Sequence, residues 1–249
     1  MRPSRIKLTD KIRAVTTFKD RLAAIEERIE QACRRAGRRR EEVRLMAVSK
    51  VHPVEAIFEA AEAGVSLFGE NRVQEFERKR PELVHLNQIE VHLIGHLQAN
   101  KSAKAAELFS AIDTLDSLRL AERLNDAAQK LNRSLPVLLE IKLSPEATKT
   151  GLDPAGHELD ELLDRMPDLS HLYVRGLMTI APLDDNPDSA RNCFRQLRKL
   201  RDELAARHSR LHLSQLSMGM SGDFEIAIEE GSTMVRIGTA LFGKREVRP

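Results

Sequence analysis

The sequence has 249 residues, of which 41% are hydrophobic, and its 40 Lys and Arg against 38 Asp and Glu give a formal net charge of +2. This length allows one sizeable domain or two small ones. Because positive and negative charges nearly balance, the composition does not demand nucleic acid or an anionic membrane as a partner. Two cysteines give no disulfide framework, and no apolar stretch approaches the roughly 18 residues of a membrane span or resembles a signal peptide, so we expect a cytoplasmic protein.

The chain opens with residues 1–17, which we expect to be a mobile segment. A helix is predicted over residues 18–36, because apolar residues recur on one face and Gly37 follows as a stop signal. Five arginines flank that glycine, where cations favour the helix dipole. Since no aromatic residues are interleaved with them, we interpret the cluster as a helix end rather than a nucleic-acid site. The cluster consists of Arg34, Arg35, Arg38, Arg39 and Arg40.

From residue 43 onward, short apolar runs alternate with helical patterns to the end of the chain. The runs predict strands over residues 43–49, 66–68, 91–94, 111–115, 137–141, 173–179, 215–217 and 234–237. The intervening patterns predict a helix that ends before Pro81 and further helices over residues 54–63, 101–109, 117–130, 157–166, 188–208 and 223–230. Eight strands joined in turn by helical crossovers are what a closed (β/α)8 barrel requires.

We therefore predict an α/β fold with a single domain, a (β/α)8 TIM barrel over residues 18–249 with an extra N-terminal helix. The strands are near-continuous apolar runs, as buried parallel strands are, and no linker rich in Pro, Gly or Ser divides the chain. A doubly wound open sheet remains an alternative, although such sheets usually carry a glycine-rich first turn that is absent here.

Lys50 directly follows the first predicted strand, at the edge where parallel α/β proteins place their chemistry. A partly dehydrated lysine amine can lose its proton and attack a carbonyl carbon. Taken alone, this residue is more often a solvated lysine at a strand end. The other strand ends decide between the two interpretations.

Two further strand ends contain residue types that bind phosphate. The segment from Ser217 to Asp223 follows the seventh strand and combines glycines, for close backbone approach, with serine hydroxyls and the start of a helix. Gly238 and Thr239 follow the eighth strand, and barrels commonly bind phosphate between these two loops. The plain alternative is that Ser221 or Asp223 merely caps the next helix.

A lysine that attacks carbonyls and a phosphate cup together indicate a phosphorylated aldehyde, and pyridoxal 5'-phosphate (PLP) is the common cofactor of that shape. Specific motifs run in order along the chain: Ala47-Val48-Ser49-Lys50, Phe68-Gly69-Glu70-Asn71 with Val73-Gln74-Glu75, His92-Leu93-Ile94-Gly95 with Leu97-Gln98-Ala99-Asn100-Lys101, Gly176-Leu177-Met178, residues 216–224 and residues 231–243. Through these motifs the chain resembles the YggS/PROSC family, the pyridoxal phosphate homeostasis proteins, from about residue 18 to its end.

The resemblance implies a barrel like the N-terminal domain of alanine racemase, with PLP held as an internal aldimine by Lys50. It also implies roles for seven other residues. Ser217, Ser221, Gly238 and Thr239 match the phosphate cup, Asn71 and Met218 match residues that line the pocket, and Arg236 matches the arginine facing the pyridine nitrogen. Because a guanidinium cannot accept the pyridinium proton, the ring nitrogen is expected to stay unprotonated and the ring to be a poor electron sink.

Four residues raise questions that the resemblance does not answer. Glu140 and Lys142 stand where the family usually has Gln and Asn, and they could pair with each other or face different sides. His96 stands where the family often has proline. Because His92 and His96 have no evident carboxylate partner in the sequence, no metal site is predicted.

The resemblance implies a protein of intracellular PLP homeostasis and delivery rather than an enzyme. Racemases add a second domain whose tyrosine works on the opposite ring face, whereas the sole tyrosine, Tyr173, is predicted to lie away from the barrel mouth. One lysine base cannot easily serve both faces. The alternatives are an amino-acid racemase or related fold-type III enzyme and a sugar-phosphate enzyme that uses Lys50 as its Schiff base. The expected partners are PLP, related B6 vitamers and PLP-dependent apo-enzymes, with no nucleic acid and no membrane.

Overall fold

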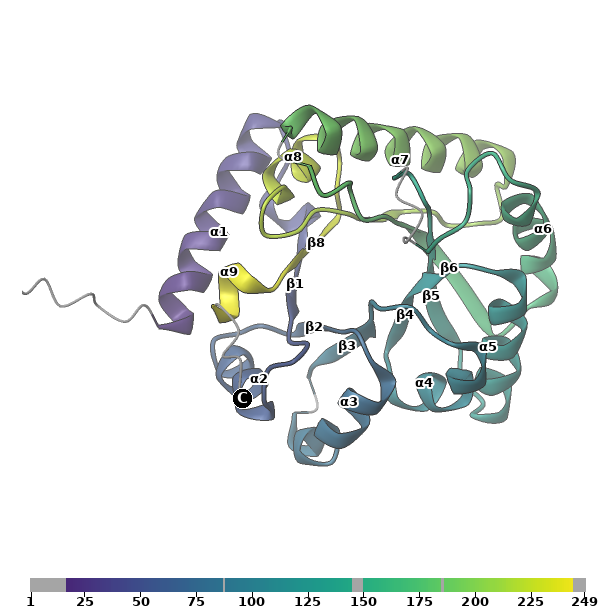
Figure 1. Ribbon diagram of the computed structural model, residues 1–249, viewed down its shortest axis with the longest axis horizontal. Coiled ribbons are helices and arrows are strands. Elements are labelled where there is room, and N and C mark those ends of the chain that lie inside the picture. The colour runs from purple at the N-terminus through teal and green to yellow at the C-terminus, as the bar shows by residue number, and fades with distance from the viewer. Residues whose placement is uncertain (1–16, 87, 145–149, 185, 244–249) are drawn as a thin grey trace, which may run out of the picture.

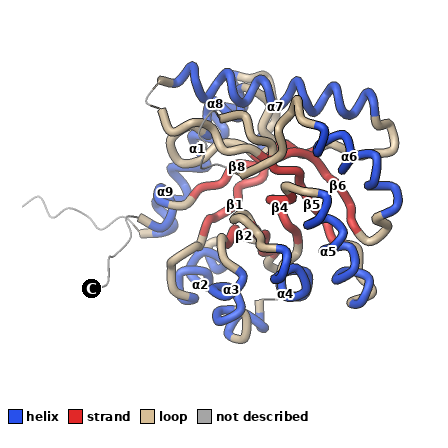
Figure 2. Tube along the Cα trace, turned by 45° about the vertical axis from the view of Figure 1, so that its right-hand side comes forward, coloured by secondary structure: helices blue, strands red, loops and turns tan. Residues whose placement is uncertain are grey.

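The structure is a computed structural model that describes residues 17–86, 88–144, 150–184 and 186–243. Within these residues, eight parallel strands follow one another around a closed barrel, and the last pairs with the first (Figures 1 and 2). The strands are β1 (Arg44–Val48), β2 (Leu67–Glu70), β3 (Glu90–Leu93), β4 (Ala111–Leu115), β5 (Leu135–Glu140), β6 (Leu172–Met178), β7 (Gln215–Ser217) and β8 (Met234–Ile237). The predicted single-domain (β/α)8 barrel is confirmed, and the open doubly wound sheet is excluded.

Helices cover the outside of the barrel. They are α1 (Phe18–Arg35), α2 (Val54–Glu62), α3 (Val73–Lys79), α4 (Ser102–Leu108), α5 (Leu118–Lys130), α6 (His157–Arg165), α7 (Pro187–Arg207), α8 (Phe224–Glu229) and α9 (Thr239–Phe242). Helices α1 to α8 lie where the sequence predicts helices, with ends shifted by a residue or so. Helix α9 was not predicted, because four residues are too short for a periodic pattern. None of the helices in the described ranges is long and apolar enough to cross a membrane.

Helix α1 is the predicted extra helix, and it packs on the outside of the barrel beside α8 and α9 (Figure 1). Thr17 begins it with a capping box, in which its hydroxyl accepts from the Asp20 N–H and the Asp20 carboxylate accepts from the Thr17 N–H. Phe18, Ile25 and Ile29 form its buried face. Residues 1–16, most of the segment predicted to be mobile, lie outside the described residues.

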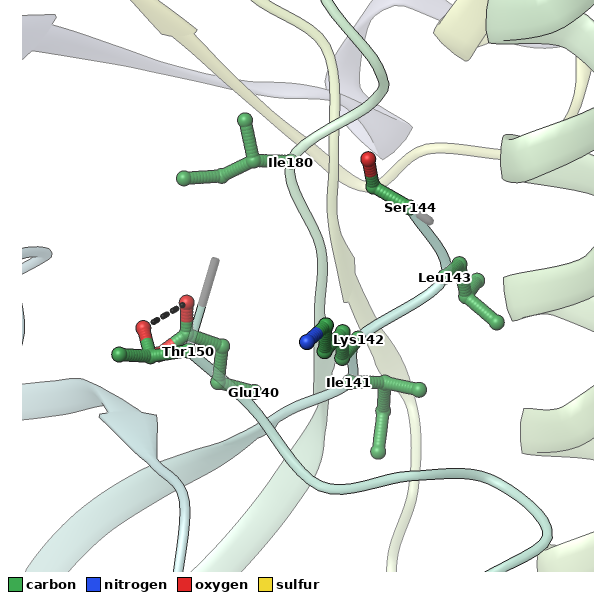
Figure 3. A pocket seen from close by; sticks show the side chains of 7 residues that line it. All are labelled: Glu140, Ile141, Lys142, Leu143, Ser144, Thr150 and Ile180. Carbon is green, nitrogen blue, oxygen red and sulfur yellow. Dashed lines mark hydrogen bonds between the residues drawn. The ribbon is translucent and has the colours of Figure 1, made fainter. Parts of the chain in front are cut away.

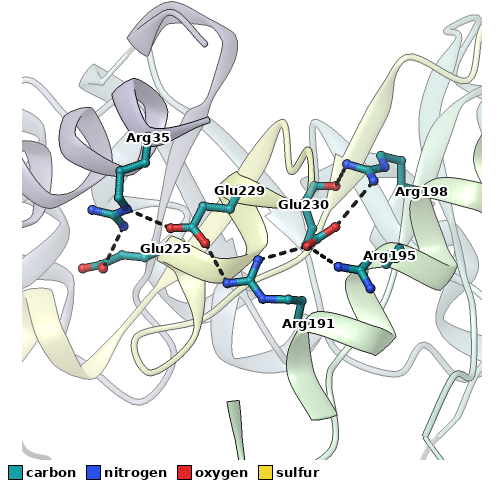
Figure 4. A network of polar contacts seen from close by, with 7 residues as sticks. All are labelled: Arg35, Arg191, Arg195, Arg198, Glu225, Glu229 and Glu230. Carbon is teal, nitrogen blue, oxygen red and sulfur yellow. Dashed lines mark hydrogen bonds and ion pairs between the residues drawn. The ribbon is translucent and has the colours of Figure 1, made fainter. Parts of the chain in front are cut away.

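Ion pairs fix α8 between α1 and α7 (Figure 4). Arg35 of α1 contacts Glu225 at 3.2 Å and Glu229 at 2.8 Å. Arg191 of α7 contacts Glu229 at 2.7 Å and Glu230 at 3.0 Å. Each exposed pair contributes little alone, but a network that spans three helices fixes their relative positions. All five arginines of the predicted helix-end cluster form ion pairs within the protein.

The interior of the barrel contains an apolar layer that is separate from the main core. This layer consists of Met46, Leu67, Leu138, Met178 and Met234, with Ile94 and Ile180 packed against it. The residues next to these in sequence, such as Ala47, Phe68 and Leu139, belong to the core between strands and helices. Because side chains alternate along a strand, the first cluster shows which positions of β1, β2, β5, β6 and β8 point into the barrel.

Candidate functional site at the mouth of the barrel

Lys50 and Asn71 occupy inward positions at the carboxyl end of the barrel. Met46 of β1 and Leu67 of β2 point inward, and counting in twos along each strand from these residues reaches Lys50 and Asn71 just past the strand ends. Lys50 is half-buried. The structure therefore places the predicted lysine at the barrel mouth, where the active sites of such barrels lie.

A buried ion pair lies behind Lys50, between the barrel and α3. The Lys79 ammonium donates to Glu70 Oε1 at 2.8 Å and to the main-chain carbonyl of Ser49 at 3.2 Å. The Ser49 hydroxyl donates to the same Glu70 oxygen at 2.8 Å. Burial raises the pKa of Glu70, while the charge of Lys79 acts in the opposite direction. These contacts fix the residue immediately before Lys50.

The residue immediately after Lys50 is also fixed, and in a strained conformation. Val51 has a φ of 61°, which a β-branched residue rarely adopts and which costs on the order of 1–3 kcal/mol. Its N–H donates to Glu75 Oε1 at 2.6 Å, and that oxygen also accepts from Lys79 at 2.8 Å. One network therefore determines the backbone on both sides of Lys50.

Arg236 lies inside the barrel, two residues past the inward-facing Met234 of β8. Its guanidinium donates to the Ser217 hydroxyl at 2.7 Å and to the main-chain carbonyls of Ser217 and Thr179, each at 2.8 Å. Burial lowers the pKa of Arg236, and the acidic residues around it counter that effect. The three acceptors hold the guanidinium in one orientation below the mouth.

The loops after β7 and β8 lie against each other. The Ala240 N–H donates to the Ser221 hydroxyl at 3.4 Å and so joins them. Gly219 has a φ of +96°, and a Cβ there would lie 2.5 Å from the Cβ of Ala227, so only glycine allows this loop to pack on α8. Met218, predicted to line the pocket, is fully buried.

Several polar groups in these two loops remain available to a ligand. Among the residues that the structure describes, no acceptor is found for the main-chain N–H groups of Ser221, Gly222 and Thr239. Thr239 is exposed, and Gly238 beside it is half-buried. Asp223 stands at the N-cap of α8, but no side-chain hydrogen bond caps the helix, because the Asp223 carboxylate accepts from the Met220 N–H and the Ser221 hydroxyl accepts from the Ala240 N–H. N–H groups and hydroxyls gathered in this way suit an anion such as phosphate.

Asn71 presents an unpaired polar atom at the mouth. Its side-chain oxygen is buried and has no hydrogen-bond partner. Gly95 approaches the same residue so closely that a Cβ there would lie 2.3 Å from the Asn71 carbonyl oxygen. Since buried polar atoms in proteins are normally paired, the Asn71 amide marks a place for a polar group of a ligand.

The two histidines that raised the question of a metal each have an aspartate partner. His92 Nδ1 lies 3.1 Å from Asp113 Oδ1 inside the barrel, and His96 Nδ1 lies 3.1 Å from Asp116 Oδ2 at its rim. The expectation that neither had a carboxylate partner was therefore wrong. The neighbouring strand β4 and the residue just after it supply these partners, and sequence spacing does not show them. In the described part of the chain, no group of three or more His, Cys, Asp and Glu could hold a metal ion.

The structure brings most of the predicted residues to one end of the barrel, and two of the predicted phosphate ligands also form hydrogen bonds within the protein. Ser217 and Ser221 were both predicted to bind phosphate, and their hydroxyls accept from Arg236 and Ala240 respectively. The sequence analysis missed Glu75 and Lys79 as supports of Lys50. Their spacing of four residues on a helix was the available signal, but nothing local indicated the contact of Lys79 with Ser49.

Comparison with known proteins finds relatives that match almost the whole chain. Residues 21–246 match the family described as "Alanine racemase, N-terminal domain". A pyridoxal phosphate homeostasis protein of Aquifex aeolicus is 45% identical over 227 residues, which cover 91% of this chain and 98% of that protein. The protein of the same name from Escherichia coli K12 is 44% identical over 227 residues, covering 90% of this chain and 95% of its own.

Solved structures share the fold. PipY of Synechococcus elongatus PCC7942, determined with PLP bound, superposes with a TM-score of 0.82 at 42% identity and covers 91% of this chain and 100% of its own. Alanine racemase of Clostridium difficile 630 superposes with a TM-score of 0.70 at 16% identity, covering 91% of this chain and 57% of its own. At that identity the racemase supports the fold alone.

Proposed function

The chain belongs to the family of the pyridoxal phosphate homeostasis proteins, and from that membership and the geometry of the mouth we propose that it binds PLP for cofactor homeostasis and delivery. In this proposal Lys50 Nζ bonds to the aldehyde carbon of PLP and the condensation releases one water. The observation that carries the proposal is the half-buried Lys50, at the barrel mouth, with its backbone fixed on both sides.

The residues present fit PLP. The free N–H groups of Ser221, Gly222 and Thr239 suit its phosphate, and the unpaired Asn71 amide suits a polar substituent of its ring. When bound, PLP supplies an aldehyde that condenses with amines and a ring that withdraws electrons. The protein supplies the amine, the anion site and the orientation.

In this proposal Arg236 faces the pyridine nitrogen, as the resemblance implies, and so determines how strongly the ring withdraws electrons. Its guanidinium has donors only and already gives hydrogen bonds to Ser217 and Thr179. It therefore offers no acceptor for a proton on that nitrogen, which leaves the ring a weak electron sink. The only tyrosine, Tyr173, lies at the start of β6, at the far end of the barrel from the mouth.

These features support a protein that holds and releases PLP rather than one that turns over amino acids. The test is to mix the purified, PLP-loaded protein with a PLP-dependent apo-enzyme and to measure recovered enzyme activity, while alanine racemisation is assayed separately. We expect transfer of the cofactor and negligible racemisation. Racemase turnover in the usual enzyme range of about 1–10³ per second would instead favour the racemase alternative.

A further inference from the structure

A cavity opens at the end of β5, where the chain carries Glu140 and Lys142 in place of the Gln and Asn of the family pattern. Its volume is about 190 Å³. This is smaller than the roughly 300–1,000 Å³ of pockets for drug-sized ligands, yet several times the ~30 Å³ of a water molecule. The lining consists of Glu140, Ile141, Lys142, Leu143, Ser144, Thr150 and Ile180 (Figure 3).

Glu140 presents a carboxylate oxygen that no group among the described residues satisfies. The residue is only 6% exposed. Its Oε1 accepts from the Thr150 hydroxyl at 3.1 Å, whereas its Oε2 is buried without a partner. An unsatisfied buried acceptor costs about 1–3 kcal/mol, and more when it is charged. A ligand with a positively charged donor would remove that cost.

Lys142 carries the opposite charge and forms no ion pair with Glu140 in the described part of the chain. Within the described ranges, no carboxylate forms an ion pair with the Lys142 ammonium. Counting in twos from Leu138 places both residues on the inward side, and Figure 3 shows the Lys142 nitrogen on the same side of the chain as the Glu140–Thr150 pair. Their Cα atoms are therefore about 7 Å apart, which leaves room for a ligand between the two charged groups.

The backbone makes this arrangement rigid. The Lys142 N–H donates to the Leu152 carbonyl at 2.9 Å, and the Leu152 N–H donates to the Glu140 carbonyl at 2.8 Å, so the returning chain extends the sheet beside β5. Gly151, just before Leu152, has a φ of +122°, and a Cβ there would lie 2.9 Å from the main-chain nitrogen of Lys142. The two charged side chains thus project from a fixed support.

We propose that this cavity is a subsite for a small zwitterionic molecule, an α-amino acid or a related ammonium carboxylate, whose ammonium donates to Glu140 and whose carboxylate accepts from Lys142. Ile180, which packs against the apolar layer inside the barrel, gives the cavity an apolar wall that suits a small aliphatic side chain. This proposal rests on the proposed function, because it places an amine-bearing ligand at the same barrel mouth as the cofactor.

Alanine is the probe, and the protein is tested both free of PLP and after borohydride treatment of the PLP-loaded form. In the reduced form Lys50 can no longer exchange partners, so calorimetric titration reports the subsite alone. We expect a millimolar dissociation constant. Acetate and ethylammonium, which carry one charge each, should bind at least tenfold more weakly.

Two variants locate the binding. Glu140→Gln and Lys142→Met should each weaken alanine binding about tenfold or more, since a hydrogen bond to a charged group is worth about 1.5–3 kcal/mol. Lys101→Met, at a half-buried lysine that does not line the cavity, is the control and should leave binding unchanged. Urea unfolding of each variant verifies that it is folded.

If the unaltered protein did not bind alanine, or if Glu140→Gln and Lys142→Met bound it as tightly as the unaltered protein does, the subsite would be overturned. Failure of the PLP proposal has a different signature, because a protein that takes up no PLP would show no cofactor absorbance while the PLP-free form still binds alanine. The subsite and the cofactor site are therefore tested by independent readouts.

Discussion

Arg236 Nη1 donates to both the hydroxyl and the main-chain carbonyl of Ser217, at 2.7 Å and 2.8 Å. Both side chains are buried. A hydroxyl has two acceptor lone pairs and one donor, so the Ser217 O–H can still donate to a phosphate while its oxygen orients the guanidinium. This contact connects the predicted phosphate cup to the predicted neighbour of the pyridine ring.

The hydroxyls of the two loops should contribute unequally to PLP affinity. Ser221→Ala and Thr239→Val should each lower it about tenfold or more, because a hydrogen bond to a charged group is worth about 1.5–3 kcal/mol. Ser217→Ala should mainly release Arg236, so the spectrum of bound PLP should change while the preference for PLP over pyridoxal falls less. Titration with PLP and with pyridoxal measures that preference. Equal affinity of the unaltered protein for both compounds would remove the phosphate cup from the account.

The buried pair behind Lys50 should be sensitive to the loss of one partner. Lys79→Met leaves Glu70 buried without its cation, which should cost about 3–5 kcal/mol in the free energy of unfolding. Adding Glu70→Gln should recover much of that loss, because no unpaired charge is then buried. Urea unfolding of the single and double variants measures both effects.

The matched control for that cycle is Lys104→Met. Lys104 is partly exposed and pairs with Glu77 and Glu107, so its loss should change the unfolding free energy by no more than about 0.5 kcal/mol. If Lys79→Met were equally mild, the network would not be fixing the backbone beside Lys50.

His92 should make stability depend on pH in the neutral to alkaline range. Burial alone would lower the pKa of His92, but the charge and hydrogen bond of Asp113 and the hydrogen bond of Glu90 raise it from 6.5 to about 9. A raised pKa stabilises the folded state fully below pH 6.5, and the stabilisation is lost as the pH rises through about 9. The free energy of unfolding should fall by up to about 3 kcal/mol over that range.

The His92 prediction is measured by urea unfolding at a series of pH values, with His92→Gln as the comparison. The variant has no proton to lose at this position, so its profile should be flatter. An NMR titration of the His92 ring gives the pKa directly. A midpoint at or below the ordinary value of about 6.5 would contradict the stabilising pair with Asp113.

The barrel was predictable from the sequence because its signals are local. Each buried strand is a short apolar run and each helix has its own periodicity, so the order of elements alone indicates the closed barrel. Lys50 and the loops after β7 and β8 were predictable for the same reason, since residues that follow strands meet at one mouth.

The contacts that support the site were less predictable because they join distant parts of the chain. Lys79 of α3 reaches the Ser49 carbonyl, and His92 of β3 reaches Asp113 of β4. Such pairs depend on strand register and helix rotation, which no short window of sequence contains. The unpaired oxygen of Glu140 is likewise visible only once its surroundings are in place.

The most direct test of the central claim is to treat the PLP-loaded protein with borohydride and to map the modified peptide by mass spectrometry. Lys50 faces inward just past the end of β1, and the network of Glu70, Glu75 and Lys79 fixes the backbone on both sides of it. We expect the cofactor to be fixed to Lys50, and we expect Lys50→Ala to give no reducible adduct. A stable adduct on another lysine of the unaltered protein, or an undiminished adduct in Lys50→Ala, would contradict it.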